Sequence, residues 1–209
     1  MRLFACAIFL CAIALAADSI DAFGHRWTVQ NPADWAIVSP TEISLKIPGT
    51  PPPGIPRRPQ KFAIAETEPF RKVTIEAEIR RAKRSLILVY AWQDKDHFNY
   101  AHISSDSAAT QAHHNGMFHV FGGERVRISA LDGPASLPTQ DWIPVKLVFD
   151  GDSGRCYVEV AGKRNPSLDA VDLSLRHGRV GLGSFDETGD FRNVKIKGEP
   201  KSNPAVGHQ

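Results

Sequence analysis

Residues 73–80 read VTIEAEIR, and apolar and polar side chains alternate through all eight positions. A period of two predicts a β-strand with one buried and one hydrated face. Similar short runs occur elsewhere, separated by turn signals such as Gly122-Gly123 and Asp132-Gly133-Pro134. Further strands are predicted at residues 42–47, 86–92, 98–104, 117–121, 125–130, 145–149, 156–161, 179–185 and 191–196. Because no helical period intervenes, the pattern predicts an all-β chain folded as an antiparallel sandwich or barrel.

The composition is that of an ordinary globular protein. The 209 residues are 42% hydrophobic and 23% charged, which excludes disordered, collagen-like and coiled-coil classes. Lys and Arg total 25 against 23 Asp and Glu, for a net charge of +2. Because the charges are nearly balanced, the protein has no strong electrostatic field that would attract nucleic acid or an acidic membrane surface. Neither is expected as a partner.

The two ends of the chain differ from the rest. Met1-Arg2 precedes an apolar run, Leu3 to Ala17, that is shorter than the ~20 residues of a bilayer span. Residues 1–17 are therefore predicted to be a cleaved secretory signal, with a retained anchor as the alternative, and the protein to be secreted or periplasmic. One domain is expected over residues 18–198, followed by a flexible polar tail at 199–209.

Prolines and cysteines add two constraints. Residues 48–59 hold six prolines, so this segment is expected to run as an extended loop at the rim. Cys6 and Cys11 lie in the predicted signal, which leaves Cys156 alone in the mature chain without an intrachain disulfide. Cys156 is expected to be buried as a small hydrophobic residue rather than to act as a nucleophile.

The runs at residues 86–92 and 98–104 flank a short polar stretch and predict a hairpin. If Trp92 pairs with Phe98, one face of the hairpin carries Leu88, Tyr90, Trp92, Phe98, Tyr100 and His102. The other face then carries Ile87, Val89, Ala91, Ala101 and Ile103. Since the first set is aromatic and polar and the second small and aliphatic, the first is expected to line a ligand groove and the second the core.

Five of the eight histidines fall between residues 97 and 119. A single histidine is more often structural, but the cluster favours a role for His102 and for one of the pair His113 and His114. Tyrosine and histidine offer an acid and a base near neutral pH, and nearby Asn or Arg can neutralise a carboxylate or an oxyanion. The candidate catalytic residues are Tyr100, His102 and His114. The candidate substrate-binding residues are Tyr90, Trp92, His113, Asn115, Arg125 and Arg127.

Metal and carboxylate motifs are weak in this sequence. His102, His113 and His114 lack the spacing of a zinc site, and neither a catalytic metal nor a required cofactor is predicted. Asp186 and Asp190 could hold a structural calcium ion, with ordinary turn chemistry as the alternative. Glu76 and Glu78 share a strand face, as the paired carboxylates of glycosidases do, although two solvated acids are the more common case.

Several segments of the second half resemble a known family. These are Trp142–Leu147, Asp150-Gly151, Tyr157–Val160, Gly178–Phe185 and Phe191–Ile196. Together they resemble concanavalin A-like, laminin-G-like jelly rolls, and among these most the bacterial secreted 3-keto-disaccharide hydrolase (DUF1080) domains. The resemblance, which extends from Phe70 onward, implies a jelly-roll β-sandwich of two curved sheets with ligands on the concave one. The Glu-x-Asp-x-x-Glu motif of laminarinase-type members is absent, which argues against retaining glycosidase chemistry.

The sequence and the resemblance together predict a secreted carbohydrate-active protein. It is expected to bind and cleave a glycan or modified sugar, by chemistry of the polysaccharide lyase or 3-keto-glycoside hydrolase type. His102 or His114 would be the base and Tyr100 the acid. The alternative is a non-catalytic, lectin-like carbohydrate-binding module, since aromatic side chains are sufficient to stack on sugar rings. A third hypothesis is a surface adhesion or scaffold domain that recognises protein.

Overall fold

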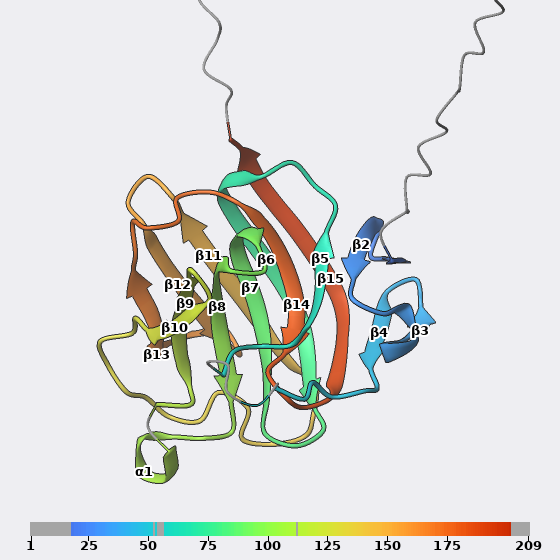
Figure 1. The fold of residues 1–209 in the computed structure, drawn as a ribbon. Coiled ribbons are helices and arrows are strands. Elements are labelled where there is room, and N and C mark those ends of the chain that lie inside the picture. Colours follow the sequence, from blue (N-terminus) through green and yellow to red (C-terminus); the bar gives the residue numbers. More distant parts are fainter. Residues whose placement is uncertain (1–17, 52, 54–56, 112, 202–209) are drawn as a thin grey trace, which may run out of the picture.

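The computed structural model describes residues 18–51, 53, 57–111 and 113–201. Within these residues the chain forms two antiparallel β-sheets, of eight and seven strands, packed face to face (Figure 1). The all-β, two-sheet prediction is therefore confirmed. The predicted signal at residues 1–17 lies outside the described residues. Within the described part of the chain, no helix is long and apolar enough to cross a membrane.

The strands occupy the two sheets in an interleaved order. In spatial order the eight-stranded sheet contains β1 (Ser19–Ala22), β2 (His25–Val29), β5 (Lys61–Ala65), β14 (Arg179–Ser184), β7 (Ser85–Asp94), β8 (His97–Ser104), β9 (Gly116–Phe121) and β10 (Glu124–Arg127). The seven-stranded sheet contains β13 (Lys163–Val171), β12 (Arg155–Val160), β11 (Ile143–Asp150), β6 (Phe70–Arg81), β15 (Gly189–Pro200), β4 (Glu42–Leu45) and β3 (Trp35–Ser39). A 3-10 turn, η1 (Pro32–Asp34), and one short helix, α1 (Ala108–Gln111), lie between strands.

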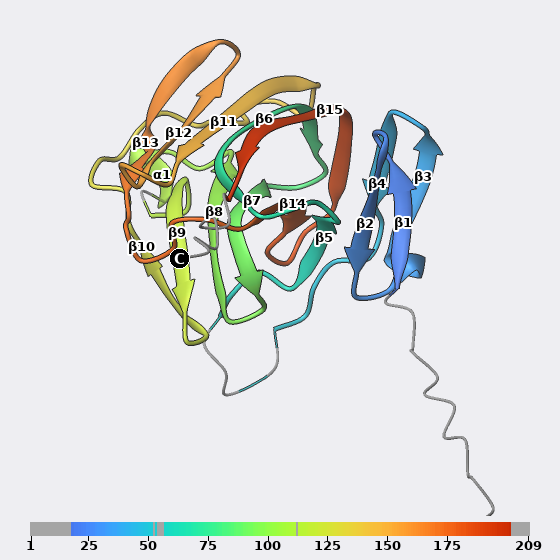
Figure 2. The same cartoon turned by 90° about the horizontal axis from the view of Figure 1, so that it is seen from above.

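The N-terminal strands extend one end of the sandwich. Strands β1 to β4 lie together at that end, while β10 and β13 lie at the opposite end (Figures 1 and 2). The sequence patterns missed β1, β2, β3, β5 and β13, because these strands are short or, in β13, polar and interrupted by Pro166. At the other terminus β15 runs to Pro200, two residues past the predicted boundary of the domain.

The alternation of residues 73–80 is realised in β6. Val73, Ile75, Ala77 and Ile79 are buried between the sheets, whereas the residues between them are only partly buried. Strand β6 pairs with β11 on one side and β15 on the other, so it lies in the middle of its sheet. Each large apolar side chain buried in this way contributes about 1.5–3 kcal/mol. Cys156, also in this core, is 1% exposed as expected, and burial raises the pKa of its thiol.

The pairing of β7 with β8 differs from the prediction. Tyr100 lies opposite Val89, His102 opposite Ile87, and Tyr90 opposite Asn99. This register is shifted by one residue, and a one-residue shift moves side chains to the other face. Tyr90 consequently points into the space between the sheets, where its ring lies 5.1 Å from that of Phe149. The predicted placement of Leu88 and Tyr90 on the ligand face, and of Ile87 and Val89 in the main core, is wrong.

A bulge near the end of β7 causes the shift. Three residues, 91–93, stand between Tyr90 and Asp94, while only Phe98 stands between their partners Asn99 and His97. Ala91 adopts a left-handed conformation with φ 50°. Gly178 permits this bulge, because a Cβ on Gly178 would lie 2.2 Å from the carbonyl carbon of Ala91. The bulge returns Trp92 to the outer face, where it packs against Phe62 and Phe98 as an outward-facing residue.

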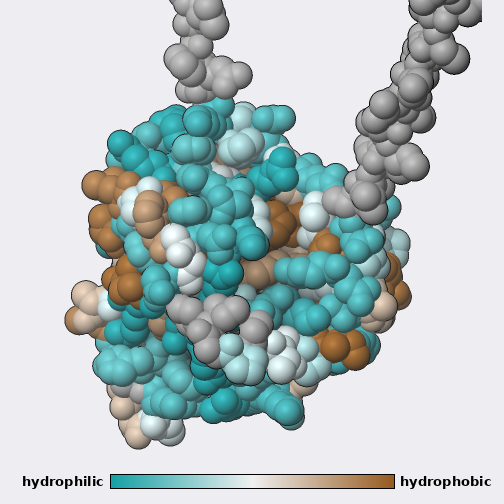
Figure 3. Space-filling view, in the orientation of Figure 1, coloured by the Kyte–Doolittle hydropathy of each residue, from teal (hydrophilic) through white to brown (hydrophobic). Residues whose placement is uncertain are grey.

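The outer face of the eight-stranded sheet has an apolar cluster of its own. We call it the outer aromatic cluster; it consists of Phe62, Ile64, Ile87, Val89, Phe98, Tyr100, Phe118 and Val120, with Trp92 packed against it. The described residues of the proline-rich segment form no strand, as expected, and Arg58 there pairs with Asp96 of the β7–β8 turn at 2.6 Å. Elsewhere the face seen in Figure 1 is mainly hydrophilic (Figure 3).

Candidate functional site

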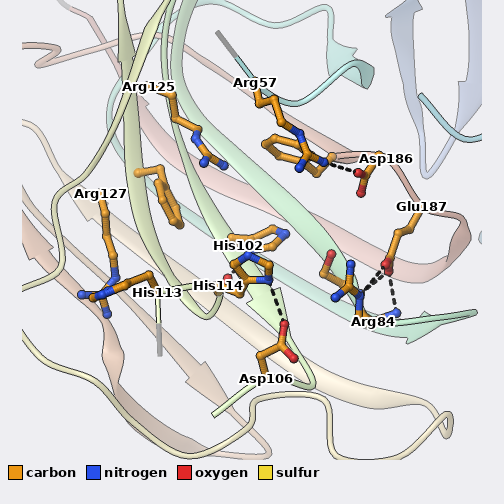
Figure 4. A pocket seen from close by; sticks show the side chains of 13 residues that line it. Arg57, Arg84, His102, Asp106, His113, His114, Arg125, Arg127, Asp186 and Glu187 are labelled. Atoms are coloured by element: carbon orange, nitrogen blue, oxygen red, sulfur yellow. Dashed lines mark hydrogen bonds and ion pairs between the residues drawn. The ribbon is translucent and has the colours of Figure 1, made fainter. Parts of the chain in front are cut away.

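A cavity of ≈ 350 Å³ opens on the outer face of the eight-stranded sheet, at the end where β8 finishes (Figure 4). We call it the arginine–histidine pocket. It is lined by Arg57, Arg84, Ser85, His102, Asp106, His113, His114, Phe118, Arg125, Arg127, Phe185, Asp186 and Glu187. Its volume lies at the lower end of the roughly 300–1,000 Å³ range of small-molecule sites, so it suits a ligand of one or two sugar rings.

Sheet pairing brings these residues together. His102 near the end of β8 lies opposite Gly116 at the start of β9, and β10 follows beside β9. On the other side, β14 ends next to the start of β7, which places Phe185 and Glu187 across from the β9–β10 side. Asp106, His113 and His114, which lie between β8 and β9 in the chain, also line the pocket.

Glu187 holds one wall in place. Its buried carboxylate accepts the backbone N–H groups of Arg84, at 2.5 Å, and of Ser85, at 2.6 Å. The Arg84 side chain pairs with the same carboxylate at 3.2 Å. These bonds tie the segment after β14 to the start of β7, so that the neighbouring Phe185 ring is held against the pocket.

His102 is a buried titratable group of the pocket. Its Nδ1 atom bonds to the backbone carbonyl of His114, so this nitrogen carries the proton and Nε2 is left as an acceptor. Within the described residues Nε2 has no hydrogen-bond partner. Burial lowers the pKa of His102 to about 4, against a smaller upward effect of the bond to His114. The imidazole is consequently neutral at pH 7.

His114 and Asp106 form an oriented pair. Nδ1 of His114 lies 3.0 Å from the Asp106 carboxylate, which also accepts the hydroxyl of Ser104 at 3.1 Å. The Asp106 side chain is 13% exposed and that of His114 is 39% exposed, so the acid is held inside while the imidazole meets solvent. A carboxylate on Nδ1 fixes that proton and presents Nε2 as the basic atom. This is the arrangement of a general base and its orienting group.

The four arginines of the pocket are not equivalent. Arg57 pairs with Asp186 at 2.7 Å and Arg84 with Glu187 at 3.2 Å. Arg127 pairs with Asp132 at 2.9 Å and also donates to the carbonyls of Ser129 and Leu131. Arg125 makes no ion pair with any of the described residues. Its guanidinium lies over two rings, 5.1 Å from the centre of Phe118 and 4.9 Å from that of Phe185.

Five residues predicted from the sequence line this pocket: His102, His113, His114, Arg125 and Arg127. They come from β8, from β10 and from the segment before β9.

Four other predicted residues do not line it. Tyr90 lies in the core between the sheets, and Trp92 packs at the Phe98 end of the outer aromatic cluster. Tyr100 is fully buried, with its ring stacked on Phe118 at 5.2 Å, and burial raises the pKa of its hydroxyl. Asn115 is also buried. Its side chain accepts the backbone N–H of Ser104 and donates to the carbonyl of Pro134 and the hydroxyl of Ser167, so it connects three segments of the chain. The prediction that these four residues line the ligand groove is therefore wrong.

The sequence patterns missed much of the pocket. Arg57, Arg84, Asp106, Phe185 and Glu187 lie in turns and loops that are distant in sequence. Asp106 precedes His114 by eight residues, and that separation matches no motif of known chemistry. A weak signal was available only for Asp186, which the sequence suggested as a calcium ligand rather than as a partner for an arginine.

Three of the four carboxylates considered for metal or sugar chemistry pair with arginines instead. Asp186 bonds to Arg57, and Asp190 pairs with Arg80 at 2.8 Å. Glu78 pairs with Arg192 at 2.6 Å and accepts from Asn193 at 2.7 Å, and these bonds hold its pKa below the ordinary value. No group of three His, Cys, Asp or Glu side chains is placed to hold a metal within the described residues. The structural calcium ion stays a prediction.

Comparison with known proteins supports the fold. No protein-family model and no curated protein sequence matches this chain. Among solved structures, the carbohydrate-binding module CBM66 from Bacillus subtilis matches with a TM-score of 0.55 and 14% identity, over 87% of this chain and 92% of that chain. A "Putative glycosyl hydrolase from Parabacteroides distasonis" matches with a TM-score of 0.56 and 12% identity, over 80% of this chain and 91% of that chain. At these identities the likeness establishes the concanavalin A-like β-sandwich fold.

Proposed function

We propose that this chain is a carbohydrate-active protein that binds a sugar of a glycan in the arginine–histidine pocket and acts on it by acid–base chemistry. The observation that carries the proposal is the His114–Asp106 pair, whose imidazole is half-exposed at the pocket while its carboxylate is held inside. The fold shared with a carbohydrate-binding module and with the Parabacteroides protein supports a carbohydrate ligand. It does not by itself choose between binding and catalysis.

In this proposal His114 removes a proton from the bound sugar through Nε2, and Asp106 stabilises the resulting imidazolium. His102 is the weaker candidate for the base, because its low pKa of about 4 gives little driving force for taking a proton at neutral pH. Arg125 is placed to stabilise negative charge that develops on an oxygen of the sugar. Elimination from a uronate would use these parts: the C5 proton passes to His114, a C4–C5 double bond forms as the C4–O bond breaks, and the leaving oxygen takes its proton from water. Cleavage of a 3-keto-glycoside, as in the DUF1080 family, would begin in the same way with the proton next to the carbonyl. The proposal includes export, on the evidence of residues 1–17.

The test offers the purified protein uronate polysaccharides and 3-keto-glycosides and measures product formation. His114→Gln is expected to lower kcat at least about a hundredfold, and Asp106→Asn by a smaller factor, because positioned bases contribute roughly 10²–10⁴-fold. His97→Gln is the matched control, since His97 also bonds to a carboxylate, that of Asp94 at 2.9 Å, but does not line the pocket. Equal rates for wild type and His114→Gln would refute the catalytic role.

The second candidate function is a non-catalytic carbohydrate-binding module. The observation that favours it is the burial of Tyr100: its hydroxyl has no access to the pocket, so the acid expected to work with the histidine base is missing there. For such a module, sugars bind without any product, and His114→Gln changes affinity alone. Isothermal titration with the same sugars, run beside the activity assay, separates the two functions.

A further inference from the structure

Three of the four arginines that line the arginine–histidine pocket form ion pairs, and the fourth does not. Arg57, Arg84 and Arg127 each have a carboxylate of their own, in Asp186, Glu187 and Asp132. The remaining acid of the lining, Asp106, bonds to Nδ1 of His114. Arg125, which lines the same cavity, has no ion pair with any of the described residues. An arginine without a carboxylate partner favours an anionic group on the ligand.

Arg125 is held without being neutralised. Strand β10 places it opposite Val120 on the outer face of the sheet, and its guanidinium lies over the rings of Phe118 and Phe185. The two rings restrict the planar group, and no carboxylate of the described residues occupies its N–H groups. A guanidinium oriented in this way matches the two oxygens of a carboxylate or a sulfate.

We infer that Arg125 recognises an anionic substituent of the bound sugar, so that the ligand is an acidic sugar with a carboxylate or sulfate group. This inference rests on the proposed function and narrows its substrate class. The cavity of ≈ 350 Å³ then holds one acidic ring, with the anion at Arg125 and the ring atoms toward His114 on the opposite side (Figure 4). Both groups line one cavity, so a single sugar can meet the cation and the base together.

The test uses matched sugars that differ only at C6. Methyl glycosides of gluco, galacto and manno configuration are titrated into the purified protein as the neutral hexoside, the hexuronide and the 6-sulfate. At least one acidic member is expected to bind about 10–100-fold more tightly than its neutral partner, as a charge-assisted contact would provide. That preference is expected to weaken as salt is raised. The carboxylate and sulfate arms show which anion the pocket accepts.

Variants of Arg125 complete the test. Arg125→Gln is expected to remove most of the acidic preference while affinity for the neutral sugar changes little, and Arg125→Lys to retain part of it, since Lys keeps the charge but not the planar fork. Arg179→Gln, at an exposed arginine of β14 outside the pocket, is the matched control. Thermal unfolding of each variant shows whether it remains folded.

The outcomes separate this inference from the proposed function. If neutral and acidic sugars bind alike, and Arg125→Gln behaves as wild type, the inference is wrong while sugar binding stands. If none of the sugars binds and longer acidic and neutral oligosaccharides also fail, the proposed function itself is refuted, and the inference falls with it.

Discussion

The outer face of the eight-stranded sheet has two contrasting ends. At the end near the β7–β8 turn, Phe62, Trp92 and Phe98 pack closely, with ring centres 4.9–5.3 Å apart. At the other end, His102 and Phe118 lie beneath an open cavity surrounded by arginines and carboxylates. One continuous sheet surface thus carries a sealed aromatic cluster and a polar pocket side by side.

The contrast shows that residue type alone does not indicate a sugar site. Aromatic side chains on an outer sheet face can stack on sugars, but here they pack on one another and gain stability by excluding water. Most of the charged groups, in contrast, are held by specific partners, such as Asp106 for His114, and a cavity stays open between them. The aromatic end therefore supports the sheet, and the polar end is left for chemistry.

The largest expected effect is on stability at the aromatic end. Phe98 is fully buried, so Phe98→Ala is expected to lower the free energy of unfolding by about 3–5 kcal/mol through the lost transfer energy and the cavity left behind. Denaturant unfolding measures the change. Phe121→Ala, at a ring that is 49% exposed, is the control and is expected to cost far less. Similar losses for the two variants would contradict a sealed cluster at Phe98.

The second prediction concerns acid stability at the boundary between the two ends. Native His102 has a pKa of about 4 against an ordinary 6.5, so the unfolded chain binds a proton that the native chain does not. The free energy of unfolding is therefore expected to fall as pH drops from 6.5 toward 4, by about 1.4 kcal/mol per unit and roughly 3 kcal/mol in total. His102→Asn can still donate to the His114 carbonyl but does not titrate. Parallel pH curves for the two proteins would contradict the buried, neutral imidazole.

The third prediction tests the bulge that orients Trp92. A Cβ on Gly178 would lie 2.2 Å from a backbone atom of Ala91, so Gly178→Ala is expected to cost about 1–3 kcal/mol or more by overpacking. Gly162→Asn is the control, because Gly162 has φ +76° but no atom within 4 Å of an added Cβ. Denaturant unfolding reports the loss, and Trp92 fluorescence reports its environment. An unchanged stability would show that the bulge does not need this close approach.

The smallest effect is expected at Tyr100. Its hydroxyl is buried without a partner in the described residues, so Tyr100→Phe is expected to leave stability within about 1 kcal/mol of wild type. Sugar turnover and binding are expected to be unchanged as well, because the hydroxyl does not reach the pocket. A variant that remains stable but loses activity would restore Tyr100 as the acid, and would mean that the two ends work as one site.

Part of the candidate site could be predicted from the sequence. His102, Arg125 and Arg127 are candidate site residues in the sequence and do line the pocket, because alternation within a strand is a local property. The position of Tyr90 was wrong, because a bulge at Ala91 changes the register in a way that alternation does not reveal. Arg57 and Glu187 could not be predicted, since they approach the pocket only through the pairing of β5, β14 and β7.

The sequence by itself determined the class of fold. Apolar residues repeat with a period of two through most of the chain, and an antiparallel sandwich or barrel buries such a pattern. Tertiary structure alone decided which polar residues meet, and which arginine lacks a carboxylate. The physical reason is that side-chain alternation acts over two residues, whereas ion pairs and cavities form between segments whose separation is set by strand order.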